Sequence, residues 1–299
     1  MRLSFSGIRN HKAAATGLLG ALALACAASP FAARVTQAQA NSPEDTATAA
    51  ICPIVYPDDQ SPAGRGYHYT FFGNAFFIND EGYLLTAAHV LETFRDGGQA
   101  YILVSRPDAP ARLLKVAVIA KDTQHDVAIV RASPNPFSGK YTVASLPLSS
   151  EPAVRGQAVL ALSLHPRRLQ DAQSFEAQSE DSSPGTVLSY ESTQLEKSAP
   201  TATVFLLSHP VVKGQSGSPV LALDSHAVVG LVEGLWLRGT PLPLAKSASP
   251  PNNTPGAAIP IRYAIALLQK HGIVWRAGSA SPEPSSSTAS PSVRDRPRQ

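Results

Sequence analysis

Two series of short apolar segments occupy the middle of the chain and constrain its fold more than any other feature. The segments are rich in β-branched or aromatic residues and are bounded by Gly, Pro, Asn or Asp, a pattern that predicts strands and turns. The first series is Tyr69–Ile78, Tyr83–Thr86, Tyr101–Val104, Leu113–Ala120 and Val127–Val130. The second series is Ala158–Leu164, Gly185–Tyr190, Val204–Leu207, Pro219–Leu223 and Ala227–Val232.

One helical pattern follows these strands. Apolar residues recur at helical spacing between Ile261 and His271, and Gly272 provides a stop. Asn79–Gly82 predicts a hairpin turn, whereas the polar residues 165–184 predict a long loop. Many short strands with one terminal helix predict an all-β sandwich or barrel, and this pattern does not choose between the two.

The start of the chain predicts export. Basic residues precede the small, apolar stretch 13–28, and Ala38-Gln39-Ala40 matches the cleavage pattern of a secretory signal peptide. We therefore expect residues 1–40 to be a signal peptide and the mature protein to be periplasmic or extracellular. Cleavage nearer Ala27 is one alternative, and a lipoprotein anchor at Cys26 is a less favoured one.

Removal of this signal changes the charge and the cysteine content. Of the 25 basic residues, four lie in residues 1–40, so 21 remain against 22 acidic residues and no basic patch with interleaved aromatics is left. This composition does not favour a nucleic-acid partner. Only Cys52 remains, so no intrachain disulfide is expected. No membrane-spanning segment is expected after the signal.

Three segments carry residues suited to nucleophilic catalysis. His89 comes directly after Leu85-Thr86-Ala87-Ala88, at the end of a predicted strand. Asp126 stands at the start of the apolar run Val127–Val130, and Ser216 lies between Gly214 and Gly217. A serine hydroxyl needs an adjacent base, and the base needs an acid that orients it. Alone, each segment has an ordinary structural interpretation, but the order His, Asp, Ser predicts an assembled triad.

Two other hydrolase classes fit the sequence less well. An α/β-hydrolase needs Gly-x-Ser-x-Gly followed by its acid and histidine, whereas Ser218 replaces the second glycine here. The alternation of strands and helices that this fold needs is also missing. A zinc hydrolase is disfavoured because the sequence contains no His-Glu-x-x-His motif. We therefore expect no metal and no cofactor.

The three segments resemble those of the trypsin-like serine proteases of chymotrypsin fold. The segments Gly73–His89, Leu164–Pro166, Gly185–Ser189 and Ala257–Ile261 are similar to the protease domain of bacterial high-temperature-requirement (Deg) enzymes. The resemblance implies two six-stranded antiparallel β-barrels with a C-terminal helix. It also implies that the N–H groups of Gly214 and Ser216 form the oxyanion hole.

The resemblance gives the following domain boundaries. Residues 41–65 are expected to be a lead-in segment and residues 66–273 the protease domain. Within that domain, residues 66–146 would form the first barrel and residues 153–273 the second. Residues 274–299 are rich in Ser and Pro and are expected to be a disordered tail, with no PDZ-like module.

The sequence departs from the resembled family at three positions. Gln215 stands where trypsin has Asp, so the family's zymogen switch is not expected; Ser218 replaces Gly; and Glu233 lies on the strand expected to line the cleft. Glu233 is open to three interpretations: an influence on specificity, coupling to Asp126, or a solvent-facing position. The expected pocket walls are His209, Pro210, Val211, Val232, Glu233 and Gly234.

These features predict a secreted or periplasmic serine endopeptidase that acts on proteins or peptides through an acyl-enzyme intermediate. Neither pocket wall offers the pocket-floor Asp that would select Lys or Arg, so small or apolar P1 residues are expected, although His209 could instead read a polar or acidic side chain. One alternative is a catalytically silent protease-fold binding protein. Another is a chaperone-like oligomer; the oligomeric state is left open.

Overall fold

The computed structural model describes residues 43–58, 68–94, 99–106, 109–168, 175–195, 200–237, 240–242 and 254–278. The chain divides into two units, Met1–Ala40 and Asn41–Gln299, and every described residue belongs to the second. The expected signal peptide and residues 279–299 of the expected tail therefore lie outside the described residues.

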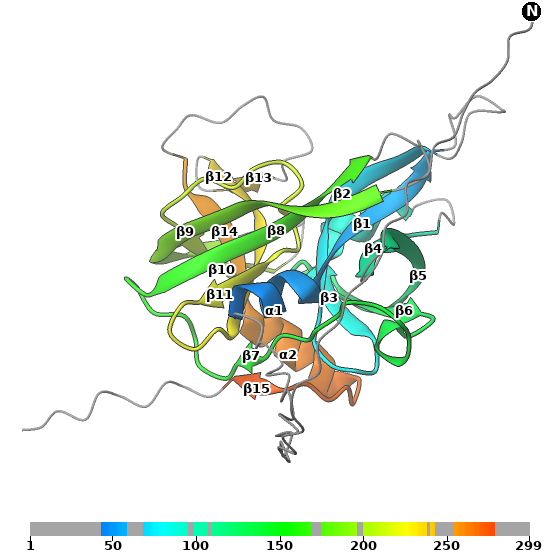
Figure 1. Ribbon diagram of the computed structural model, residues 1–299. Coiled ribbons are helices and arrows are strands. Elements are labelled where there is room, and N and C mark those ends of the chain that lie inside the picture. Colours follow the sequence, from blue (N-terminus) through cyan, green and yellow to red (C-terminus); the bar gives the residue numbers. More distant parts are fainter. Residues whose placement is uncertain are drawn as a thin grey trace, which may run out of the picture. The chain divides into compact units, whose positions relative to one another are not determined.

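Six antiparallel strands from the first half of this unit form a closed barrel (Figure 1). Their order around the barrel is β5-β4-β1-β2-β3-β6, and pairing of β5 with β6 closes it. The strands are β1 (Ile51–Asp58), β2 (His68–Phe77), β3 (Tyr83–Ala87), β4 (Tyr101–Arg106), β5 (Ala109–Asp122) and β6 (Val127–Ser133). The expected hairpin turn joins β2 to β3, and Gly82 adopts a φ of 82° there.

A second closed barrel follows. Its order is β10-β14-β12-β11-β8-β9, and pairing of β10 with β9 closes it. The strands are β8 (Ala158–Arg168), β9 (Phe175–Thr193), β10 (Ala202–Leu207), β11 (Pro219–Ala222), β12 (Val228–Leu237) and β14 (Gly256–Pro260). The expected all-β fold of two six-stranded antiparallel barrels is confirmed.

The remaining elements connect or cover the barrels. Strand β7 (Leu148–Ser149) lies between the two expected barrels and pairs in parallel with β12 and with β15 (Ala277–Gly278), while β13 (Thr240–Leu242) pairs antiparallel with the end of β12. The helices are α1 (Pro43–Ala50) and α2 (Ile261–Lys270), with the short 3₁₀ turns η1 (Ala88–Phe94) and η2 (Pro136–Ser138). No helix in the described part of the chain is long and apolar enough to cross a membrane.

Helix α2 is the C-terminal helix that the sequence predicted. Its apolar side packs inward through Ile261, Ala264, Leu267 and Leu268, all of them buried. Gly272 follows with a φ of 65°, a left-handed conformation that glycine adopts without steric cost and that ends helices.

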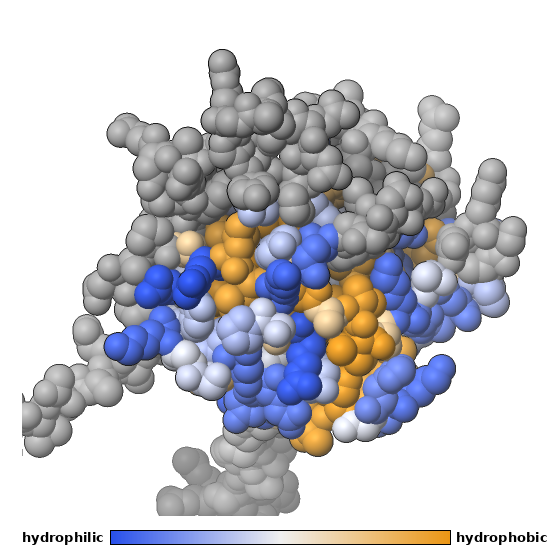
Figure 2. Space-filling view, turned by 90° about the vertical axis from the view of Figure 1, so that its right-hand side faces the viewer, coloured by the Kyte–Doolittle hydropathy of each residue, from blue (hydrophilic) through white to orange (hydrophobic). Residues whose placement is uncertain are grey.

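Burial of apolar strands stabilises the two barrels. Phe76, Phe77 and Ile129 are fully buried in the first core, and Phe205 and Val220 are fully buried in the second. Each such side chain contributes about 1.5–3 kcal/mol relative to an exposed position. Figure 2, which views the first-barrel side, shows that some apolar residues also reach the surface among polar ones.

Two segments differ from the sequence-based expectation. The expected lead-in segment supplies α1 and all of β1, which pairs with both β2 and β4. Residues 165–168 and 175–184, which fall within the expected loop, instead extend β8 and β9 into a long hairpin whose register runs from Ala158↔Thr186 to Arg168↔Phe175. In both segments the strands are held by cross-strand pairing, which for β1 is with β2 and β4 and for β8 and β9 is with each other, rather than by a local apolar pattern.

Candidate active site

The pairing of β3 with β6 brings His89 and Asp126 together. Ala87, the last residue of β3, pairs with Val127, the first residue of β6. Because the strands are antiparallel, the residues after Ala87 meet the residue before Val127. The backbone N–H of Ala88 donates to the Asp126 carbonyl oxygen at 3.1 Å, which closes this corner of the first barrel.

The carboxylate of Asp126 holds His89 through two hydrogen bonds. Oδ1 accepts from the backbone N–H of His89 at 2.8 Å, and Oδ2 lies 2.7 Å from the imidazole Nδ1. The backbone of Asp126 has a φ of 54°, in the left-handed region that Asp tolerates better than most residues. This arrangement leaves Nε2 as the imidazole nitrogen that is not engaged by Asp126.

Ser216 lies in a tight turn that leads into β11. Its hydroxyl donates to the backbone oxygen of Glu233 at 3.1 Å, and the side chain is almost completely buried. In the described part of the chain, no hydrogen bond joins Ser216 to His89. The Gly217 N–H donates to the Val232 oxygen at 2.8 Å, which fixes the turn against β12.

The glycines beside Ser216 allow the turn to approach its neighbours. Gly214 and Gly217 have φ values of 94° and 79°, in the left-handed region. A Cβ on Gly214 would overlap the ring of Phe71, and one on Gly217 would overlap the backbone oxygen of Asn74. Within the described residues, no hydrogen bond takes the backbone N–H of Gly214 or Ser216.

Asn74 contacts the Ser216 turn, and the sequence pattern did not single it out. This fully buried side chain donates from Nδ2 to the Gly214 oxygen at 2.9 Å and accepts from the Leu164 N–H at 3.3 Å. Its backbone N–H donates to the Ser216 oxygen at 2.8 Å, and its backbone oxygen accepts the Thr86 hydroxyl at 2.7 Å. An Asn in the middle of an apolar strand was the available signal, because strands are depleted in Asn.

The expected pocket walls lie on two segments of the second barrel. Val232, Glu233 and Gly234 are buried in β12, beside the Ser216 turn. His209 and Pro210 are half-buried and Val211 is fully buried, and the His209 backbone oxygen accepts the Gly256 N–H of β14 at 2.8 Å. Burial lowers the pKa of His209, which keeps its imidazole neutral.

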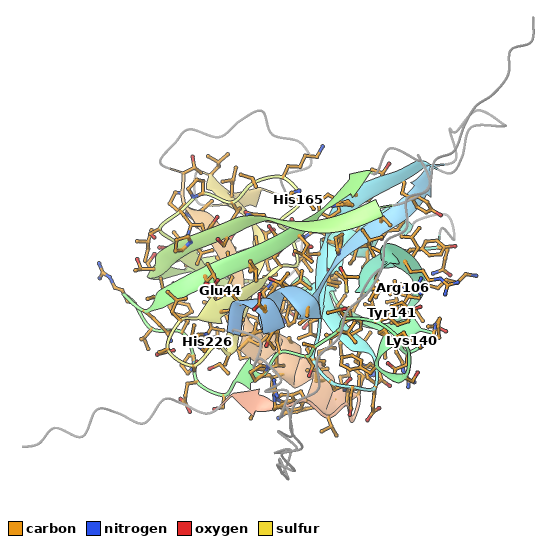
Figure 3. The ribbon with its side chains drawn as sticks, in the orientation of Figure 1. Glu44, Arg106, Lys140, Tyr141, His165 and His226 are labelled. Carbon is orange, nitrogen blue, oxygen red and sulfur yellow. The ribbon has the colours of Figure 1, made fainter. Side chains whose placement is uncertain are left out.

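Aromatic rings border the turn on its other side. His165, labelled in Figure 3, lies on β8, and its ring contacts that of Phe71 from β2 at a centroid separation of 5.1 Å. Phe71 also contacts Gly214, so these rings limit the space beside the two N–H donors.

His125, by contrast, has its own partners. Its Nδ1 lies 2.7 Å from Asp122 Oδ2, and its ring stacks on Tyr263 at 3.9 Å. These contacts place His125 in the turn before β6 rather than in the cluster formed by His89 and Asp126.

The sequence matches a known family over this region. Residues 73–231, just over half of the chain, match the family described as "Trypsin-like peptidase domain". The chain belongs to the trypsin-like peptidase family. A search of curated proteins finds no significant match.

Solved structures share the fold of this trypsin-like peptidase. The HtrA-type protease AlgW, solved with a decapeptide, has a TM-score of 0.54 and 16% sequence identity, with 78% of this chain and 68% of that chain covered. The active form of the Rv3671c protease from M. tuberculosis has a TM-score of 0.51 and 19% identity, with coverage of 81% and 88%. At these identities, the likeness shows the shared double-barrel fold.

Replacement of Asn74 by Ala tests its role in this peptidase domain. The change leaves the Gly214 oxygen and the Leu164 N–H without their buried partner, and each unsatisfied buried group costs about 1–3 kcal/mol. We therefore expect Asn74→Ala to lower the free energy of unfolding by about 2 kcal/mol or more, as measured by urea denaturation. An unchanged midpoint and slope would show that Asn74 does not hold the turn.

Proposed function

We propose that this trypsin-like peptidase is an exported serine endopeptidase with His89, Asp126 and Ser216 as its triad. The observation that carries the proposal is the 2.7 Å contact between His89 Nδ1 and Asp126 Oδ2, in a chain whose family and fold are those of peptidases. Protein or peptide substrates fit that family. The proposal includes secretion to the periplasm or the cell exterior through residues 1–40.

The proposed reaction has two stages. Ser216 Oγ attacks the scissile carbonyl while His89 Nε2 accepts its proton and then passes it to the leaving amine. Asp126 orients the imidazole and stabilises its charged form. The acyl-enzyme formed on Ser216 is then hydrolysed by water, with His89 again acting as base and acid.

The N–H groups of Gly214 and Ser216 would bind the oxyanion in both stages. Donors of this kind stabilise charge that develops in the transition state, and one is worth about 2.7–4 kcal/mol. No step of this mechanism requires a metal or a cofactor. The peptidase activity is therefore expected to be the same with and without a chelator such as EDTA.

We further propose that the substrate pocket favours small or apolar P1 side chains. Val211 and Val232 supply apolar walls, and the one acid among the expected wall residues, Glu233, has its carboxyl within 4.8 Å of His89 and Asp126. His209 is a second specificity element, because a neutral imidazole could donate a hydrogen bond to a polar P1 group. Cleavage of a peptide library mainly after Lys or Arg would reject this specificity.

A fluorophosphonate probe tests the proposed activity. We expect covalent labelling of the purified chain and loss of labelling in Ser216→Ala, with labelled peptides mapped by mass spectrometry. Folded wild-type protein that takes no label and cleaves no peptide would favour the alternative of a catalytically silent binding protein.

A further inference from the structure

Glu233 occupies a bulge beside the proposed nucleophile. In the pairing of β12 with β14, Val232 lies opposite Ala258 and Gly234 lies opposite Ala257, so Glu233 is an extra residue in β12. Bulges of this kind re-aim a side chain and are frequent next to active sites. Here the bulge carries both the carbonyl that accepts the Ser216 hydroxyl and a buried carboxyl group.

The carboxyl group of Glu233 faces the pair formed by His89 and Asp126. Ligand atoms of the three side chains all lie within 4.8 Å of one another. Glu233 is 3% exposed, and its Oε2 has no hydrogen-bond partner among the described residues. A buried carboxyl without hydrogen-bond donors is costly unless a nearby charge compensates it.

The imidazole of His89 supplies that compensation. Burial lowers the pKa of His89, but the carboxylates of Asp126 and Glu233, with a smaller contribution from exposed Glu92, raise it to about 9. Burial and Asp126 raise the pKa of Glu233, whereas the positive charge of His89 opposes this rise. The pKa of Glu233 is raised to about 8, so above that pH two carboxylates flank one imidazole and favour its charged form.

The elements packed against β12 add few other charges. The paired strands β7, β11, β13 and β14 carry no ionisable side chain, and β3 carries only Tyr83. Helix α2, which also contacts β12, contributes Arg262, Tyr263 and Lys270. The imidazole of His89, a group that can carry a positive charge, lies within 4.8 Å of the Glu233 carboxyl.

The position of the Ser216 hydroxyl agrees with a charged imidazole. An imidazolium has two N–H donors and no free lone pair, so it cannot accept a hydrogen bond from serine. The hydroxyl is instead donated to the backbone oxygen of Glu233. The bulge in β12, the buried carboxyl of Glu233 and the orientation of the Ser216 hydroxyl are three observations that point to one resting arrangement, in which His89 is protonated.

We propose that Glu233 is a positioning residue that holds His89 in its protonated form, so that the peptidase is activated by alkaline conditions. This inference rests on the proposed function, since it assigns His89 the role of general base. A rise in pH removes the His89 proton to solvent, the neutral Nε2 accepts the Ser216 hydroxyl, and catalysis becomes possible. Glu233 acts through His89 and does not contact the substrate carbonyl in this scheme.

The first test is the pH dependence of kcat/KM for a peptide substrate. Glu233→Gln keeps the backbone carbonyl and the side-chain size but removes the charge. An ionised neighbour within about 4–6 Å shifts a pKa by about one unit or more. The acid limb of the plot of kcat/KM against pH should therefore move at least about one pH unit toward lower pH in this variant. Because the pKa of Glu233 is raised to about 8 and that of His89 to about 9, the gain in activity should be largest between these two pH values and small at pH 7. Glu151→Gln makes the same change at an exposed position between the two barrels, and it should leave the acid limb of kcat/KM at its wild-type pH.

A second measurement does not depend on activity. Titration of the His89 imidazole by NMR in the wild type should give a midpoint well above that of an ordinary histidine, and Glu233→Gln should lower it. If Glu233→Gln does not fold, a wild-type His89 midpoint at or below about 6.5 would overturn the inference. Equal midpoints in the two proteins would overturn it as well. Failure of the wild type to cleave any peptide, with the NMR shift present, would reject the proposed function instead.

Discussion

Replacement of Ser216 by Ala is expected to lower kcat for peptide hydrolysis by about 10⁶-fold. The change removes the oxygen that would attack the carbonyl, so only the oxyanion donors and substrate binding can still assist the reaction. The fold should remain, because the replaced hydroxyl makes one hydrogen bond, to the Glu233 oxygen, and the backbone bond from Asn74 to the Ser216 oxygen is unaffected. Steady-state kinetics with the purified protein measure kcat, and a thermal melt shows whether the fold is retained.

Ser218→Ala is the matched control for this variant. Ser218 lies two residues further along the same turn, is fully buried, and its Oγ has no hydrogen-bond partner within the described residues. Its replacement should change kcat less than about tenfold. Comparable losses in the two variants would mean that activity depends on the packing of the turn rather than on a nucleophile at Ser216.

The sequence predicted elements whose local pattern agrees with their tertiary environment. Strand β6 is a buried apolar run that begins directly after Asp126, and α2 is an amphipathic helix followed by a glycine in the left-handed region. For both, residue type, periodicity and terminal residue favour the same structure. The order of His89, Asp126 and Ser216 predicted a triad; the structure places His89 against Asp126 and the Ser216 hydroxyl against β12.

Other elements depend on strand pairing that a local apolar pattern does not indicate. Strand β1 contains Pro53 and Pro57, which suggested an irregular lead-in segment, yet pairing with β2 and β4 holds it in the first barrel. The polar residues of the β8–β9 hairpin lack a strand-like apolar pattern and are held by the register between the two strands. Local propensity does not report such pairing, because cross-strand contacts stabilise a sheet.

The roles of Asn74 and Glu233 were hidden for a related reason. Asn74 acts through four hydrogen bonds to β3, β8 and the Ser216 turn, and none of these partners is adjacent in sequence. Glu233 was noted as a departure from the resembled family, with three interpretations left open. Its burial excludes a solvent-facing position, and the bulge in β12 explains how its carboxyl reaches His89 and Asp126.

Replacement of Asp126 by Asn is expected to lower kcat by about 10⁴-fold. The carboxylate now accepts from both the His89 backbone and Nδ1, and an amide could donate a hydrogen bond to Nδ1 instead, which would hold the imidazole in the wrong tautomer. The main-chain conformation at position 126 should be unchanged, because Asn tolerates the left-handed φ of 54° about as well as Asp does.

Asp122→Asn provides the same chemical change four residues earlier. Asp122 contacts His125 in the arrangement that Asp126 has with His89, with an N–H to Oδ1 bond of 3.2 Å and a contact of 2.7 Å between Nδ1 and Oδ2. His125 has no part in the proposed mechanism, so Asp122→Asn should leave kcat within about a factor of three. Because the two aspartates differ mainly in which histidine they hold, a large loss confined to Asp126→Asn would assign the general base to His89. A similar loss in both variants would instead attribute the effect to the structure of the turn before β6.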